Sequence, residues 1–269
     1  MCDGALRIPL EWNEPNPDMA DENGQTFLSL EVWNRGESVV RELPEPDDVN
    51  PHRIGIYGLT PLTWAAANGH EGVVRVLMER NDVNPDTADE DGRTPLWWAA
   101  RHEHERVAGV PPEQSGVNPS LAGKYGQTPL TAAAWYGREG VVETLLQRKE
   151  VNPDTADKDG HIPLSLAAQY RHEGIVKILL EQSGVNPNQA DKYGQMPLML
   201  AAHNGHEGVV RNLRILRKMN DVDPNTPDSS GRALLSYAAA NEYERVVRVL
   251  MGLSEDIPDI AESFLPNLQ

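Results

Sequence analysis

Cysteine is almost absent from this chain of 269 residues, and long hydrophobic runs are missing altogether. The single cysteine, Cys2, excludes an internal disulfide framework and suits a reducing compartment. No stretch approaches the ~18 consecutive apolar residues that a membrane-spanning helix needs. The first residues lack the basic start and apolar run of a secretory signal peptide. The sequence therefore predicts an intracellular protein of the cytoplasm or nucleus.

Basic side chains are scarce as well. Lysine and arginine total 24 against 41 aspartates and glutamates, which gives a formal net charge of −17. Such a chain is repelled by nucleic acids, because their phosphate backbone is itself negatively charged. An acidic surface attracts cationic partners over long distances. We therefore expect a protein partner with a basic segment, and neither a nucleic acid nor a membrane.

The motifs of common active sites are also missing. The chain has no G-x-S-x-G, Walker A or GxGxxG sequence. The acidic loop before Gly92 fails as a calcium loop, because its first ligand position is Thr87 and its twelfth is Trp98. The histidines of 102–104 stand two residues apart, whereas the H-E-x-x-H zinc motif places them four apart. The sequence thus predicts no enzyme activity, no cofactor and no metal site.

A short motif that returns at a fixed interval is the main positive signal. Gly58-Leu-Thr-Pro-Leu62 recurs, in progressively weaker form, with its glycine at positions 92, 126, 160, 194 and 231, and an earlier copy begins at Gly24. Successive glycines are 34 residues apart five times and 37 apart once. A fixed period of this size indicates a repeat array, in which each unit buries its apolar side against its neighbours.

One unit, residues 58–91, shows how each repeat should fold. Thr60 and Pro61 predict a helix start, since the hydroxyl caps free N–H groups and proline fits the first helical position. An Asn-Gly pair ends that helix. A second helix from His70 carries apolar residues at the spacing of one buried stripe. The turn-rich segment 81–92 then leads to the next copy.

Two short antiparallel helices, a long hairpin loop and the TPLxxAA pattern at the first helix resemble the ankyrin repeat. The resemblance covers about seven copies over residues 16–251. It implies an all-α ankyrin-repeat solenoid of helix-turn-helix repeats joined by hairpin loops. The period is 34 rather than the family's 33, and the pattern is similar to arrays in very large fungal proteins. We expect residues 1–15 to be a partial or degenerate N-terminal capping repeat, and residues 252–269 to be a C-terminal capping tail.

Ankyrin arrays hold protein partners on a concave face, formed by the hairpin tips and the exposed side of the first helices. By this resemblance, the face uses the two residues before each motif glycine, the one after it, and the ninth and tenth after it. Aromatic residues are frequent at these positions, and exposed aromatics commonly anchor protein interfaces. The partner-binding candidates are Trp33, Ile56, Tyr57, Leu59, Arg101, His102, Tyr125, Trp135, Tyr136, Tyr170, Tyr193 and His203. Trp64, Trp98 and Tyr237 stand six residues after a glycine, a position expected to face the core.

Two repeats depart from the regular pattern in the length of their second helix. Pro111 and Pro112 stand where apolar helix residues are expected, so the second helix of that repeat should end near Val110. Three extra residues after Gly208 predict a longer second helix there.

Histidines recur at the start of the second helices, and we interpret them as structural groups that bond between helix ends. Hairpin tips alternate between an acidic class (Asp86, Asp89, Glu90, Asp91; Asp154, Asp157, Asp159) and a tyrosine class (Tyr57, Tyr125, Tyr193).

The favoured reading is a protein-interaction module without chemistry of its own, acting as a monomer or as part of a larger chain. Two alternatives remain open. An enzyme on an ankyrin scaffold would line a pocket with Trp135, Tyr136 and Tyr170. A structural or sensor array of a larger signalling protein would instead bind another domain of its own chain.

Overall fold

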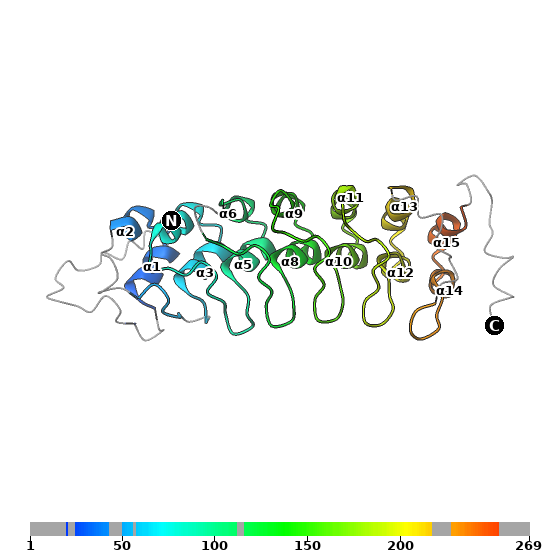
Figure 1. Ribbon diagram of the computed structural model, residues 1–269, viewed down its shortest axis with the longest axis horizontal. Coiled ribbons are helices and arrows are strands. Elements are labelled where there is room, and N and C mark those ends of the chain that lie inside the picture. Colours follow the sequence, from blue (N-terminus) through cyan, green and yellow to red (C-terminus); the bar gives the residue numbers. More distant parts are fainter. Residues whose placement is uncertain are drawn as a thin grey trace, which may run out of the picture.

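The repeats stack side by side into an elongated array of helix pairs (Figure 1). In this view the first helices of the repeats form one row, their loops extend to one side, and the second helices form a row on the other side. The structure is a computed structural model that describes residues 20, 25–42, 50–55, 58–111, 116–216 and 227–252. Within these residues the regular structure is helical, apart from an isolated β-bridge between Pro227 and Ala233.

The first helices, called inner helices below, are short and rich in alanine. They are α1 (Phe27–Trp33), α3 (Pro61–Ala67), α5 (Pro95–Arg101), α8 (Pro129–Tyr136), α10 (Pro163–Gln169), α12 (Pro197–His203) and α14 (Leu234–Ala240). The second helices, called outer helices, each begin with glutamate. They are α2 (Glu37–Glu42), α4 (Glu71–Glu79), α6 (Glu105–Ala108), α9 (Glu139–Leu146), α11 (Glu173–Glu181), α13 (Glu207–Leu216) and α15 (Glu244–Met251). This regular alternation confirms the predicted all-α solenoid.

Threonine caps start several inner helices, as the sequence predicts. The Thr60 hydroxyl accepts a hydrogen bond from the backbone N–H of Thr63 at 3.2 Å, and two further threonines cap α5 and α8 in the same way. Each is followed by proline at the first helical position, where a backbone N–H would have no partner in the helix. In α10 the cap position holds Ile162, whose backbone N–H donates to the Ser165 hydroxyl at 2.9 Å. Helix α10, whose motif lacks the threonine, is therefore capped by a different hydrogen bond.

The hydrophobic core lies between the inner and outer rows, and it consists of two clusters. Most alanines of the inner helices are buried, which lets neighbouring repeats approach closely. One cluster runs from Leu28 to Val107 and the other from Leu96 to Leu250. Helices α5 and α6 contribute residues to both clusters. The core therefore divides within a single repeat, the one that carries Pro111.

Helix α6 is the shortest described helix, with four residues, and it ends at Ala108. This confirms the predicted end near Val110. The last carbonyl groups of a helix lack partners within it, and here Arg148 of the next repeat supplies them. One of its terminal N–H groups donates to the carbonyl oxygens of Ala108 and Val110, at 2.5 and 2.6 Å. The predicted longer helix is α13, which has ten residues and is the longest described.

Histidines at the start of the outer helices join neighbouring repeats. Their Nε2 atoms lie within hydrogen-bond distance of a carbonyl near the end of the preceding inner helix: His104 to Ala67 at 2.8 Å, His172 to Trp135 at 2.9 Å and His206 to Gln169 at 2.9 Å. Arg138 occupies the same position and donates from Nε to the Arg101 carbonyl at 3.0 Å. These bonds confirm that the histidines are structural.

Two further observations apply to the described part of the chain alone. None of its helices is both long and apolar enough to cross a bilayer. It also holds no group of three or more histidine, cysteine, aspartate or glutamate side chains placed to bind a metal ion. The expected caps, residues 1–15 and 252–269, lie outside the described residues except for Gly252, and Pro112 lies outside them too.

Candidate protein-binding face

An aspartate three residues before the motif glycine holds most hairpins in shape. The Asp89 carboxylate accepts hydrogen bonds from the backbone N–H groups of Asp91 and Arg93, at 2.9 and 2.8 Å. Asp157, Asp191 and Asp228 hold their hairpins in the same way. We call these four side chains the hairpin clamps: Asp89, Asp157, Asp191 and Asp228. The hairpins before Gly58 and Gly126 have Gly55 and Gly123 at this position and so lack a clamp.

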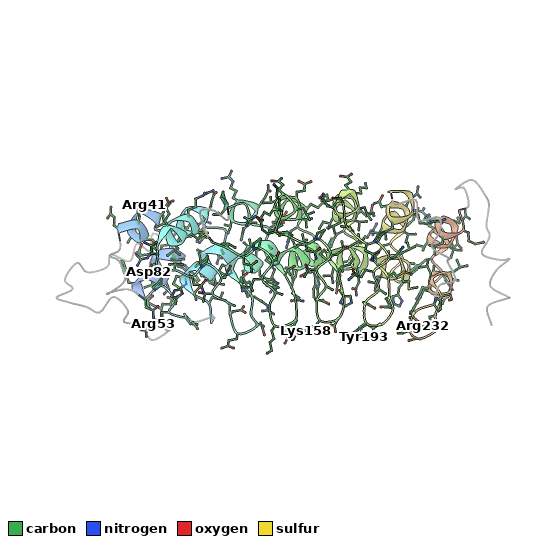
Figure 2. The ribbon with its side chains drawn as sticks, viewed as in Figure 1. Arg41, Arg53, Asp82, Lys158, Tyr193 and Arg232 are labelled. Atoms are coloured by element: carbon green, nitrogen blue, oxygen red, sulfur yellow. The ribbon has the colours of Figure 1, made fainter. Side chains whose placement is uncertain are left out.

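Backbone hydrogen bonds also connect each hairpin tip to the next. Successive bonds run from Lys124 N–H to the Asp91 carbonyl at 2.7 Å, from Lys158 to Tyr125 at 2.9 Å, from Lys192 to Asp159 at 3.0 Å and from Ser229 to Tyr193 at 3.1 Å. The motif glycine is needed for this approach: Gly92 has φ +74°, and a Cβ there would lie 2.9 Å from the Lys124 nitrogen. The tips form a continuous edge, along which Figure 2 marks Lys158, Tyr193 and Arg232.

The acidic tips differ from expectation, because most of their carboxylates are used inside the scaffold. Asp89 and Asp157 are hairpin clamps. Asp86 and Asp154 each accept a hydrogen bond from a backbone N–H of the following repeat. The three remaining acids are Glu90, Asp91 and Asp159, and the last two pair with Arg93 and Lys192. These tips therefore present less free negative charge than the sequence indicates.

The net charge is also unevenly distributed along the chain. The described residues hold 21 lysines and arginines against 25 aspartates and glutamates, a difference of −4. The whole chain has a net charge of −17. Most of the acidic excess therefore belongs to residues outside the described array, and the array itself is close to neutral.

The described candidates all reach the surface to some degree. Trp33, Tyr125, Tyr170 and Tyr193 are exposed by 48%, 51%, 42% and 52%. The histidines His102 and His203 are also exposed. Four others are half-buried: Leu59, Arg101, Trp135 and Tyr136. Ile56 and Tyr57 lie outside the described residues.

Four of these side chains, together with Trp98, form one row that crosses α5, α8 and the end of α10. Arg101 lies 5.3 Å from the ring centroid of Trp98 and 4.9 Å from that of Tyr136. Trp135 stacks on Tyr136 at 6.0 Å and on Tyr170 at 5.6 Å, with interplanar angles of 15° and 14°. We call this row the central strip: Trp98, Arg101, Tyr136, Trp135 and Tyr170. Stacking of this kind is worth about 0.5–1.5 kcal/mol per aromatic pair, so the row is held in place.

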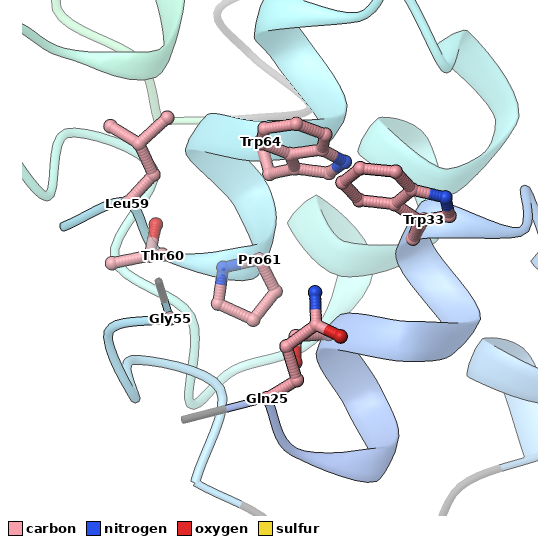
Figure 3. A pocket seen from close by; sticks show the side chains of 8 residues that line it. Gln25, Trp33, Gly55, Leu59, Thr60, Pro61 and Trp64 are labelled. Carbon is pink, nitrogen blue, oxygen red and sulfur yellow. The ribbon is translucent and has the colours of Figure 1, made fainter. Parts of the chain in front are cut away.

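Trp64 and Trp98 were expected to face the core, and the structure contradicts this. Both are half-buried and line an open groove of ≈ 660 Å³, whose other walls include Leu59, Glu90 and Arg93. Trp64 stacks on Trp33 at 4.8 Å, beside a small pocket (Figure 3). The Trp98 indole N–H donates to the Asp89 carboxylate of its own hairpin at 3.0 Å, which draws the ring toward the hairpin.

Tyr237 occupies the same repeat position and is buried, as predicted. Its hydroxyl donates to the Asp228 carboxylate at 2.6 Å. Burial alone would raise the pKa of Asp228, but this bond and the backbone N–H groups of Arg232 and Ser230 lower it to about 2. This tyrosine reinforces a hairpin clamp rather than contributing to the concave face.

The centre of the concave face is locally positive. Partial desolvation of its exposed ring lowers the pKa of His102, and the nearby charges of Arg101 and Arg138 lower it further. Within the described residues Arg101 has no carboxylate partner, whereas Arg138 pairs with Glu103 at 2.9 Å. This face can therefore bind a ligand through aromatic rings and a guanidinium. On this face Trp135 and Tyr170 stack on each other, with ring centroids 5.6 Å apart.

Comparison with known proteins agrees with this architecture. The family model described as "Ankyrin repeats (3 copies)" matches residues 28–110, 113–191 and 164–260. The crystal structure of EF0377, an ankyrin repeat protein, is similar with a TM-score of 0.63 and 23% sequence identity. That match covers 72% of this chain and 97% of the other, and at this identity it supports the fold alone. No curated protein matches the sequence significantly.

Proposed function

Because the chain belongs to the ankyrin-repeat family, we propose that it is a non-catalytic module that binds a protein partner through its concave face. Ankyrin repeats generally serve as protein-interaction modules. The observation that carries the proposal is the central strip, a row of stacked aromatics and one arginine on the surface. Rigid aromatic and arginine side chains are the groups that most often dominate binding energy at protein interfaces.

The absence of catalysis is supported by the roles that the polar side chains already have. The repeated aspartates act as hairpin clamps, and the repeated histidines bond to carbonyl groups of neighbouring repeats. A general base or nucleophile must lie within hydrogen-bond distance of the substrate atom or proton on which it acts. The aspartates and histidines already use their hydrogen-bonding atoms for contacts within the scaffold. Such a module can work alone as a monomer or within a longer chain.

The partner that we propose is a protein segment that is basic overall. The support is the net charge of −17, which attracts cations at long range. Glu90, on the wall of the tryptophan groove, adds a carboxylate that no ion pair among the described residues neutralises. The low cysteine content supports an intracellular setting for this encounter.

A pull-down from extracts of the source cell, with identification of the bound proteins, tests the proposal. The variant Tyr125→Ala, Trp135→Ala, Tyr136→Ala should lose a partner that wild type retains. The matched control, Glu143→Ala, Lys177→Ala, Glu181→Ala, changes three exposed residues of the outer helices and should keep it. If the control loses the partner and the aromatic variant keeps it, binding occurs on the outer side and the proposal is wrong.

A further inference from the structure

Arg101 is a positive charge held in the middle of the concave face. Its guanidinium lies 4.9 Å from the Tyr136 ring centroid, 5.3 Å from Trp98 and 5.9 Å from Trp97. Stacking on rings uses the flat faces of a guanidinium and leaves its N–H groups at the edge. Among the described residues, no carboxylate pairs with these N–H groups. The side chain is thus oriented by aromatic contacts alone.

The surroundings of Arg101 make it an uncompensated charge. The nearest described acid in sequence, Glu103, is paired with Arg138 at 2.9 Å. Partial desolvation lowers the pKa of His102, and the neighbouring Arg101 and Arg138 lower it further. Arg101 itself is half-buried, and a partly desolvated charge without a counterion is unfavourable. An anion that reaches Arg101 removes this penalty.

We propose that Arg101 binds the carboxylate of one aspartate or glutamate side chain in the partner segment, an inference that rests on the proposed function. A guanidinium and a carboxylate can form two parallel N–H···O hydrogen bonds, which fixes their geometry. The rings beside Arg101 come from two neighbouring helices, Trp98 from α5 and Tyr136 from α8. A segment that covers both rings runs past Arg101, which favours a side-chain carboxylate over a chain-terminal one.

The proposal predicts the character of the sequence around the acid. Tyr136, Trp135 and Tyr170 extend away from Arg101 as an aromatic surface, and apolar residues beside the acid cover it. Long-range attraction and local recognition are separate effects, since charges steer association while buried pairs hold the complex. A segment that is basic overall and carries one acid between apolar residues satisfies both.

Selection from a library of random peptides displayed on phage tests this inference directly. The targets are wild type, Arg101→Gln and the matched control Arg245→Gln, which removes an arginine that is 86% exposed on an outer helix. Wild type and the control should enrich peptides with aspartate or glutamate at one fixed position between apolar residues. Arg101→Gln should not enrich that acid. Enrichment of peptides without a fixed acid by wild type would overturn the inference.

A double-mutant cycle with one selected peptide separates recognition from a structural role of Arg101. Changing its acid to the amide should weaken binding to wild type by roughly 30-fold or more, and should have almost no effect on Arg101→Gln. Arg101→Lys keeps the charge without the planar fork and should give an intermediate affinity. If the two changes are additive, Arg101 does not bind the carboxylate and the inference fails, although the proposed function stands. If Trp135→Ala also leaves peptide binding unchanged, the proposed function fails too.

Discussion

At the scale of single residues, two aspartates of the same hairpin tip have different roles. Asp157 is a hairpin clamp whose carboxylate accepts N–H groups from Asp159 and His161, both at 2.9 Å. Asp159, two residues later, is exposed at its side chain and pairs with Lys192 of the next tip. The first bonds to the backbone of its own loop and is almost inaccessible to water, whereas the second is solvated.

Removing these two carboxylates should therefore have unequal effects. Asp157→Ala leaves two backbone N–H groups without acceptors and should lower the free energy of unfolding by about 1–3 kcal/mol. Asp159→Ala removes a solvated ion pair and should cause little or no loss. Urea unfolding of both variants measures the difference. Equal stability of the two variants would show that the clamp does not support the hairpin.

Two half-buried histidines, His70 and His206, should make the stability of the array depend on pH. Burial lowers the pKa of His70 and His206; for His70 the charges of Arg35 and His104 add to this effect. The unfolded chain then binds protons more readily than the folded chain. The free energy of unfolding should be highest above about pH 6.5, the usual histidine pKa, and should fall as the pH decreases. Urea unfolding at several pH values checks this.

The chain itself suggests the control for that pH series. Arg138 stands at the position equivalent to His206 and makes the same inter-repeat hydrogen bond without titrating in this range. His206→Arg should therefore keep the inter-repeat bond at neutral pH and reduce the pH dependence. A stability that increases on acidification, or a dependence unchanged in this variant, would contradict the proposed role of burial.

At the scale of secondary-structure elements, α6 is the exception to the period. It has four residues where α4 and α11 have nine, and the two core clusters meet at its repeat. Proline explains its early end. Arg148 then compensates in part, by donating to the carbonyl groups that the missing turn would have used.

Among the outer helices of the internal repeats, amide hydrogen exchange should be fastest in α6 and the segment after it, around residues 104–118. A repeat array opens locally where the contacts between neighbours are weakest. Arg148→Met keeps most of the apolar stem but removes the donors, so it should accelerate exchange in α6 further. Equal protection in all outer helices, or no effect of this substitution, would show that α6 is as well supported as the others.

The elements could be predicted from the sequence because they depend on local signals. Thr60 and Pro61 start α3, and the period transfers that start to the other repeats. The position of Trp98 could not be predicted, because it depends on a contact between its helix and its hairpin, the hydrogen bond to Asp89. Arg148 was missed for a similar reason: its partners are in the preceding repeat, and no local pattern links them.

At the scale of the whole molecule, most of the negative charge and the proposed binding face belong to different parts of the chain. The array that carries the central strip is nearly neutral, and the acidic excess lies mainly outside the described residues. The net negative charge, which is known from the sequence alone, indicates that the chain attracts positively charged partners at long range. It could not reveal the local positive centre at Arg101, because that depends on which carboxylates are already paired.

This separation predicts two kinetic classes of variant for a protein partner. Replacing Tyr125, Trp135 and Tyr136 by alanine should mainly speed dissociation, since each central aromatic can contribute about 2 kcal/mol or more. Glu90→Gln with Asp91→Asn should mainly slow association with a basic partner and weaken the dependence on salt. Surface plasmon resonance at two salt concentrations distinguishes the two effects. If neither set changes the kinetics, the concave face is not the binding surface.

The bonds between hairpin tips have an evolutionary consequence. They join main-chain atoms, from Lys124 to Asp91 and onward to Tyr193, so they do not depend on which side chains stand at the tips. Tip residues other than the motif glycine and the hairpin clamps are therefore free to mutate without altering the distance between one tip and the next. When repeats duplicate, the copies enter at the same spacing and can diverge separately. New specificities can arise on this edge by substitution alone, while the frame that displays them is inherited intact.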